Sequence, residues 1–230
     1  MCLHIGGFQK MTLLDFPGRI AAIVFAYGCN LRCPYCHNAS LVSLPPESFS
    51  EDEVLSYLKK RSGILDGVCI SGGEPLLQPD IGDFIGKIRD MGYKIKLDTN
   101  GTKPDKLAEL ISGGLLDYIA MDIKAPIEKY ARVTGVDSAK SNICESIRTV
   151  MGSGVDYEFR TTVVREWHGA EDILAMGEMI RGAERWFLQC FLDSGKLVGS
   201  ESLSAYGADE MRALRELAAP FAKEVGVRGI

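Results

Sequence analysis

The stretch IAAIVFAYGCNLRCPYC, residues 20–36, joins an apolar run to a set of closely spaced cysteines. Its first part, residues 20–25, has the composition and length of a buried strand. Cys29, Cys33 and Cys36 then follow at C-x3-C-x2-C spacing. Three cysteine ligands leave one iron of a four-iron cluster open to bind a substrate or cofactor, whereas four ligands suit electron transfer alone. The spacing is therefore compatible with an open-site iron-sulfur cluster at the end of a strand.

Two other uses of the cysteines stay open on spacing alone. Structural zinc usually takes four ligands in two close pairs, and no second close pair of Cys or His follows this triplet. Disulfides suit secreted chains, but seven cysteines are an odd number and no signal peptide precedes them. The remaining cysteines form no close pair, so we expect no second cluster; they are Cys2, Cys69, Cys144 and Cys190.

Apolar, β-rich segments alternate with longer amphipathic ones, which predicts βα units around a parallel sheet. The expected strands span residues 20–25, 67–70, 94–98, 118–122, 158–164 and 185–190, and the expected helices span 51–61, 81–91, 104–111, 139–151, 171–180 and 208–222. Ser50 before an acidic turn and Pro104 in a first turn are typical helix starts. Six units fall short of the eight that close a barrel.

Composition indicates one α/β domain over residues 1–230, with a core at about 16–195 and a C-terminal helical tail at about 196–230. A chain of 230 residues with 46% hydrophobic content can bury one large core. The longest apolar stretch, residues 20–26, is far below the roughly 20 residues of a membrane-spanning helix, so we expect a cytoplasmic protein without a membrane partner. A net charge of -5 and a pI near 5.3 argue against nucleic-acid binding.

Polar motifs lie where the expected strands end. Ligands of parallel α/β sheets gather at the carboxyl ends of the strands, so these motifs should meet at one mouth. Each also has an ordinary structural explanation: a tight turn, an Asx cap, a surface ion pair worth under about 1 kcal/mol, or a salt bridge at the rim. Beyond the cysteines, the candidates are Ser71, Gly72, Gly73 and Glu74, then Asp98 and Asn100, then Asp122 and Lys124, and Arg160 within the fifth strand.

The block CPYCHN, residues 33–38, resembles the radical S-adenosylmethionine (SAM) enzymes. The segments GFQK at 7–10, LDFPG at 14–18 and GCN at 28–30 are similar to activating proteins of anaerobic ribonucleoside-triphosphate reductases, and the resemblance spans about residues 7–195. It implies an open (β/α)6 partial barrel, and a 4Fe-4S cluster bound by Cys29, Cys33 and Cys36. SAM would be the second cofactor.

The resemblance also assigns residues to SAM. SAM carries an ammonium that needs oxygen acceptors, which close backbone carbonyls at glycines and the charge of Glu74 can supply. Two aspartates, here Asp98 and Asp122, would help hold a monovalent cation beside the SAM carboxylate. Some related activases place a histidine after the last strand, but residues 189–192 contain none. The implied cofactor-binding residues are Tyr35, His37, Asn38, Ser71, Gly72, Gly73, Glu74, Asp98, Asn100, Asp122, Lys124 and Arg160.

These features predict an activase that cleaves SAM reductively and installs a glycyl radical on a partner enzyme, first of all an anaerobic ribonucleotide reductase. A flavodoxin- or ferredoxin-type protein would donate the electron. Little chain remains outside the six units for a lid, so an open mouth should accept a loop of a protein substrate. The alternatives are activation of another glycyl-radical enzyme, a small radical SAM enzyme that modifies a peptide, cofactor or nucleoside, and a non-catalytic iron-sulfur electron carrier.

Overall fold

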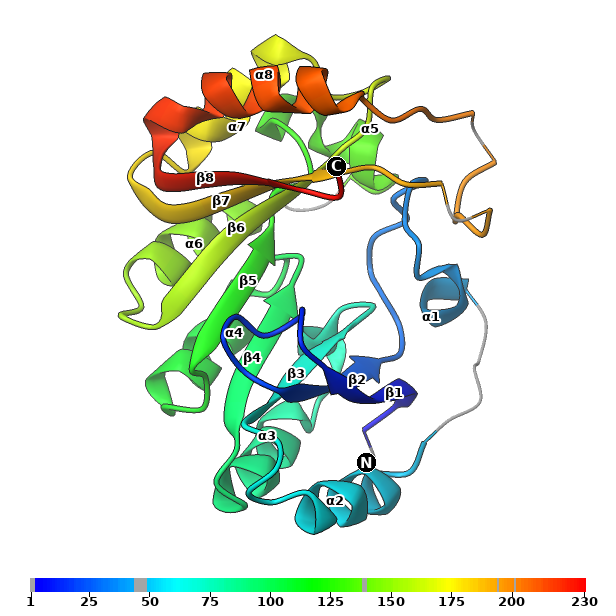
Figure 1. The fold of residues 1–230 in the computed structure, drawn as a ribbon, viewed down its shortest axis with the longest axis vertical. Coiled ribbons are helices and arrows are strands. Elements are labelled where there is room, and N and C mark those ends of the chain that lie inside the picture. Colours follow the sequence, from blue (N-terminus) through cyan, green and yellow to red (C-terminus); the bar gives the residue numbers. More distant parts are fainter. Residues whose placement is uncertain (1–2, 44–48, 138–139, 194, 201) are drawn as a thin grey trace.

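Eight strands form one curved sheet in which each strand pairs with its neighbours in sequence (Figure 1). The computed structural model describes residues 3–43, 49–137, 140–193, 195–200 and 202–230. The first pair is antiparallel and all later pairs are parallel. The strands are β1 (Ile5–Thr12), β2 (Ala21–Ala26), β3 (Gly67–Gly72), β4 (Lys94–Thr99), β5 (Tyr118–Asp122), β6 (Asp156–Val163), β7 (Ala183–Cys190) and β8 (Ala222–Arg228).

Helices such as α3 and α6 cover the convex side of the sheet (Figure 1), as the predicted partial barrel requires. The N-terminus of α2 has the predicted cap, because the side chain of Ser50 accepts a hydrogen bond from the Glu53 amide. Among the described residues, no helix is both long and apolar enough to cross a bilayer. The helices are α1 (Ala39–Ser43), α2 (Glu51–Lys60), α3 (Ile81–Asp90), α4 (Pro104–Ser112), α5 (Tyr130–Thr134), α6 (Lys140–Met151), α7 (Ala170–Met179) and α8 (Ala208–Ala218), with 3-10 turns η1 (Pro75–Leu77), η2 (Ile127–Lys129) and η3 (Ala219–Phe221).

All six predicted strands and six predicted helices are present with small shifts at their ends; residue 139, the predicted start of α6, lies outside the described residues. The predicted C-terminal helical tail, at about 196–230, contains a strand as well as the helix α8. α8 ends at Ala218 because Pro220 has no N–H to continue the helix. Residues 222–228 then form β8, which pairs parallel with β7. β1 was also missed, and these two strands are the edges of the open sheet.

The two faces of the sheet differ in chemistry because side chains alternate along each strand. On β4, Ile95 and Leu97 are fully buried in the core that contains the helix residues Phe84 and Ile85. Burying a side chain of this size contributes roughly 1.5–3 kcal/mol. The other phase of the same strand carries Lys96 and Asp98, which point to the concave side. The concave face is therefore polar and available for a ligand.

Candidate active site

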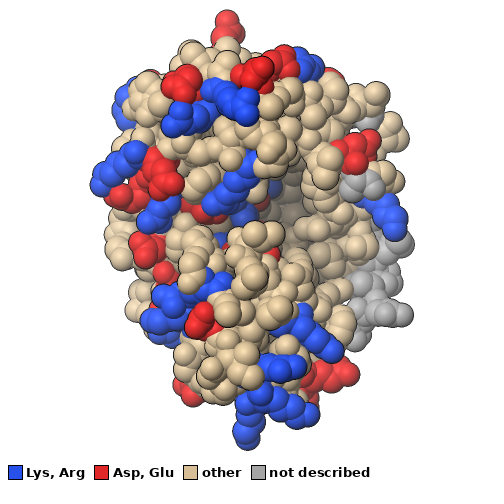
Figure 2. All heavy atoms as spheres, in the orientation of Figure 1, with Lys and Arg blue, Asp and Glu red and all other residues tan. Residues whose placement is uncertain are grey.

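A cavity of about 440 Å³ lies at the carboxyl ends of the strands, on the concave side. Figure 2 shows a hollow on this face of the molecule. Every residue predicted for the site lines the cavity except Glu74. The structure thus brings together separate segments, from the cysteine loop after β2 to Arg160 on β6, as expected for the mouth of a parallel sheet. Further lining residues are Asp15, Phe25, Leu31, Val42, Thr99, Thr162 and Gln189.

The loop that carries the three cysteines is tied to two other segments. The Glu74 amide donates to the Gly28 carbonyl over 2.8 Å, and the Arg32 amide donates to the Thr134 carbonyl over 2.8 Å. The side-chain amide of Asn38 donates to the Gly72 carbonyl over 3.3 Å. These bonds hold the cysteine loop in place from the end of β3 and from α5.

The thiols are partly or fully shielded from water. Burial raises the pKa of Cys33 to about 11 and also raises the pKa of Cys29. Both therefore carry protons at neutral pH until a metal displaces them. No group of three or more His, Cys, Asp or Glu among the described residues is arranged to hold a metal ion. A cluster needs less convergence than a single ion, because each cysteine binds a different iron.

The glycine turn after β3 fits where no larger residue could. Gly72 has a φ of +116°, and a Cβ there would lie 2.4 Å from the Ala26 carbonyl oxygen. A Cβ on Gly73 would lie 2.1 Å from the Gly28 carbonyl oxygen. The turn therefore packs backbone to backbone against the cysteine loop. This close approach places backbone groups of residues 72 and 73 in the cavity wall beside the thiols.

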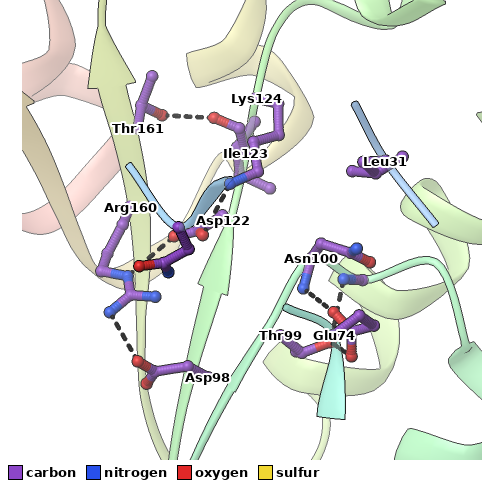
Figure 3. A network of polar contacts seen from close by, with 12 residues as sticks. Leu31, Glu74, Asp98, Thr99, Asn100, Asp122, Ile123, Lys124, Arg160 and Thr161 are labelled. Carbon is purple, nitrogen blue, oxygen red and sulfur yellow. Dashed lines mark hydrogen bonds and ion pairs between the residues drawn. The ribbon is translucent and has the colours of Figure 1, made fainter. Parts of the chain in front are cut away.

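Glu74 does not line the cavity, and its carboxylate is hydrogen-bonded to the loop after β4 (Figure 3). Its fully buried carboxylate accepts hydrogen bonds from the Leu76 amide at 3.1 Å, the Thr99 hydroxyl at 2.9 Å and the Asn100 amide at 2.6 Å. Burial raises its pKa to about 7, although these donors favour the charged form. Asn100 in turn donates to the Asn30 side chain over 3.0 Å. Glu74 thus links the turn after β3 to the loop after β4 and, through it, to the cysteine loop.

Arg160 bridges the two aspartates of the site (Figure 3). Its Nη1 lies 3.3 Å from Asp98 and its Nε 2.9 Å from Asp122, while Lys124 lies 2.9 Å from the other oxygen of Asp122. Burial alone would raise the pKa of Asp122, but Arg160 and Lys124 lower it to about 2. Ser71 donates to Asp98 over 3.0 Å. The remaining N–H groups of Arg160 and Lys124 are available to a carboxylate or ribose oxygen of a ligand.

His168 contacts the backbone of Lys124, one of the residues of this network. Its Nδ1 accepts from the Val164 amide at 2.9 Å and its Nε2 lies 2.8 Å from the Lys124 carbonyl oxygen. The ring is fully buried, and burial lowers its pKa. His168 therefore fixes the backbone that carries Lys124. Near the mouth, His37 stacks on Phe191 with ring centroids 5.9 Å apart.

Sequence reasoning missed several residues at the site. Lys96 is only 2% exposed and pairs with Asp98, and its signal was the shared face of strand residues two apart. Asp15 lines the cavity from the loop after β1 and accepts from the Thr12 hydroxyl over 2.5 Å, but no local pattern marked it. Gln189, at the end of β7, lines the cavity on the strand after which some activases place a histidine.

The family model of the radical SAM superfamily matches residues 23–176. The chain belongs to this superfamily. Solved structures share its fold: a Streptococcus suis SuiB structure with the bound precursor peptide SuiA matches at a TM-score of 0.70 and 15% identity, over 90% of this chain and 48% of SuiB. The chain thus spans about half the length of SuiB. A domain of a Bacteroides vulgatus pyruvate-formate lyase-activating enzyme matches at a TM-score of 0.56 and 18% identity, over 71% of this chain and 99% of that domain.

Two sequence relatives are named as activating enzymes. The chain is 30% identical, over 98% of its length and 96% of the relative, to a Methanocaldococcus jannaschii protein that carries the name glycyl-radical enzyme activating enzyme. It is also 30% identical to the pyruvate formate-lyase-activating enzyme of Clostridium pasteurianum, over 70% of this chain and 68% of the relative. The superfamily implies a 4Fe-4S cluster and SAM as cofactors. The residues fit both groups, because thiols, close-packed glycines and a cationic network line one cavity.

Proposed function

We propose that this radical SAM enzyme activates a glycyl-radical enzyme, with an anaerobic ribonucleotide reductase as the first candidate partner. The observation that carries the proposal is the match to a relative named as an activating enzyme, at 30% identity over 98% of this chain and 96% of the relative. A flavodoxin- or ferredoxin-type protein is the proposed electron donor, and the cytoplasm the proposed compartment.

Cys29, Cys33 and Cys36 would hold the cluster, and the cavity beside them would hold SAM. When bound, the reduced cluster would supply one electron that splits SAM into methionine and a 5′-deoxyadenosyl radical, which takes a hydrogen atom from a glycine Cα of the partner. The backbone of Gly72 and Gly73 would accept from the SAM ammonium. Arg160 and Lys124 would bind the SAM carboxylate, each using N–H groups that the aspartates leave free.

The protein's own contribution is orientation and exclusion of water. A glycine suits the partner's side of the reaction because no side chain crowds its Cα. Ser71, Asp98 and Asn100 line the cavity next to the thiols and would position SAM from the strand ends, while Tyr35, His37 and Asn38 would do so from the cysteine loop. Holding the reacting carbons close together raises the rate and keeps the radical from attacking other groups.

The proposal is tested by anaerobic reconstitution, reduction and assay of SAM cleavage to 5′-deoxyadenosine. We expect iron and sulfide in near-equal amounts, and a glycyl-radical doublet by electron paramagnetic resonance when a candidate reductase is added. Alanine at Cys29, Cys33 or Cys36 should abolish cleavage. Cys144→Ala is the matched control, because Cys144 lies on α6 and does not line the cavity.

Three outcomes would contradict parts of the proposal. Zinc without iron would remove the cluster assignment. Reversible reduction of a cluster without SAM cleavage would favour an electron carrier. SAM cleavage with no radical on any glycyl-radical enzyme would leave a radical SAM enzyme with a different substrate, such as a peptide, cofactor or nucleoside.

A further inference from the structure

Lys96 is a buried lysine that adjoins the charged side chains of the proposed SAM cavity through its ion pair with Asp98. Its ammonium forms an ion pair with Asp98 Oδ1 and lies 3.7 Å from the sulfur of Cys69 on β3. Only 2% of the Lys96 side chain is exposed. A buried ammonium is costly unless it is paired, so its place beside Asp98 indicates a fixed interaction.

With Lys96 included, side chains of the protein donate to every carboxylate oxygen of Asp98 and Asp122. Lys96 binds Oδ1 of Asp98, and Arg160 and Ser71 bind Oδ2. Arg160 binds Oδ1 of Asp122, and Lys124 binds Oδ2. All four carboxylate oxygens therefore already have a donor from the described residues. A metal cation could bind these oxygens only by displacing a cationic side chain.

The charge balance leads to the same result. Three carboxylates and three cationic groups line or adjoin this part of the cavity, namely Asp15, Asp98 and Asp122 with Lys96, Lys124 and Arg160. SAM itself brings an ammonium, a sulfonium and one carboxylate. These six side chains sum to zero charge and SAM adds a net charge of +1, so a monovalent cation would bring further positive charge beside these three cationic groups, in surroundings where burial weakens screening.

We propose that the ammonium of Lys96 is the built-in counter-ion of the SAM site, so that this protein binds SAM without a monovalent metal cation. The inference rests on the SAM site of the proposed function and opposes the cation that the family resemblance implied. Lys96 acts as a positioning residue: it holds one oxygen of Asp98, which leaves Arg160 oriented between the aspartates with N–H groups free for the SAM carboxylate.

The first test uses the wild-type protein loaded with its cluster. SAM affinity is measured by calorimetry in potassium, sodium and choline chloride at a constant ionic strength of about 0.1 M, so that screening is equal. We expect the same affinity within about twofold in all three salts. A saturable gain of about tenfold or more with potassium or sodium would overturn the inference while leaving the proposed function intact. Absence of SAM binding in every salt would overturn both.

The second test replaces the ammonium by an apolar group of similar volume, Lys96→Met. In choline chloride this variant should bind SAM about tenfold more weakly or worse, because Asp98 loses a charged partner. Potassium or sodium should restore most of the affinity and raise the thermal midpoint of the variant, since the vacated position beside Asp98 can then take an ion.

Lys94→Met is the matched control, because Lys94 has the same phase on β4 but pairs with Asp117 at the surface. It should bind SAM like the wild type and show no response to alkali cations. Wild-type affinity in Lys96→Met, or a loss that no alkali cation restores, would overturn the counter-ion role. If Lys96→Met does not fold, the salt series on the wild type decides alone.

Discussion

Gly73→Ala tests the close packing of the glycine turn against the cysteine loop. The added Cβ would lie 2.1 Å from the carbonyl oxygen and 2.6 Å from the carbonyl carbon of Gly28. Ordinary contact begins at 3.4 Å, so the turn must retreat by roughly an ångström, and the obstacle is backbone that has no rotamer to change. That retreat would stretch two hydrogen bonds, from the Gly73 amide to Ala26 at 2.9 Å and from the Glu74 amide to Gly28 at 2.8 Å.

Loss of these two bonds should lower the free energy of unfolding by about 2–6 kcal/mol, because each buried donor left without a partner costs about 1–3 kcal/mol. For a chain of this size the thermal midpoint should fall by roughly 4–24 °C. SAM affinity of the reconstituted protein should fall as well. The assays are thermal denaturation and calorimetric SAM binding.

Gly86→Ala is the control for this prediction. A Cβ at Gly86 meets no atom within 4 Å, and Gly86 lies inside α3. Alanine there should stabilise the protein by about 0.5–1 kcal/mol through helix propensity. A Gly73→Ala protein with the stability and SAM affinity of the wild type would refute the close approach of the two loops.

Three further changes test the buried ionisable groups. Burial lowers the pKa of His168, so His168 is protonated in the unfolded chain at a higher pH than in the folded protein, and stability should fall as the pH drops below 6.5. In thermal denaturation at a series of pH values, His168→Gln should lack this pH-dependent loss of stability. Burial raises the pKa of Glu74 to about 7, so between pH 4.5 and about 7 the folded protein holds a proton on Glu74 that the unfolded chain has lost, and wild-type stability should fall as the pH rises through this range. Glu74→Gln should remove this dependence of stability on pH. An unchanged dependence in the variant would contradict the raised pKa of Glu74. Arg228→Met should lower the free energy of unfolding, measured by urea denaturation, by about 2–3 kcal/mol, because Arg228 forms two hydrogen bonds to the Glu158 carboxylate, which is only 2% exposed. A decrease below about 0.5 kcal/mol would show that this ion pair contributes no more than a surface pair does.

The strands that could be predicted are those with one fully buried face. Residues 67–70 and 118–122 gave clear signals because their β-branched and apolar side chains lie under helices. β1 and β8 are edge strands with mixed burial, and each contains glycine, so neither has a continuous apolar run. Their pairing is decided by the neighbouring strand rather than by their own composition.

The composition of the site was predictable, but the direction of individual side chains was not. Strand-end positions brought Cys29, Asp98 and Arg160 to one cavity, as the general rule for parallel sheets predicts. Glu74 was expected to add charge for the SAM ammonium, but it does not line the cavity, and its carboxylate accepts from backbone and hydroxyl groups of neighbouring loops, which no sequence pattern reports. Lys96 was overlooked because a lysine between apolar residues usually marks an exposed strand face.

The order of the strands in the sheet has a consequence for how the chain is made. Each strand pairs with the one synthesised just before it, so the sheet can extend during translation without inserting a late strand between earlier ones. Lys96 and Asp98 emerge together on β4, so their ion pair can form early. Arg160 arrives only with β6, and until then Asp98 and Asp122 lack the guanidinium that joins them. The residues proposed to bind SAM can therefore come together only after β6 has left the ribosome, so the nascent chain completes this cavity late in its synthesis.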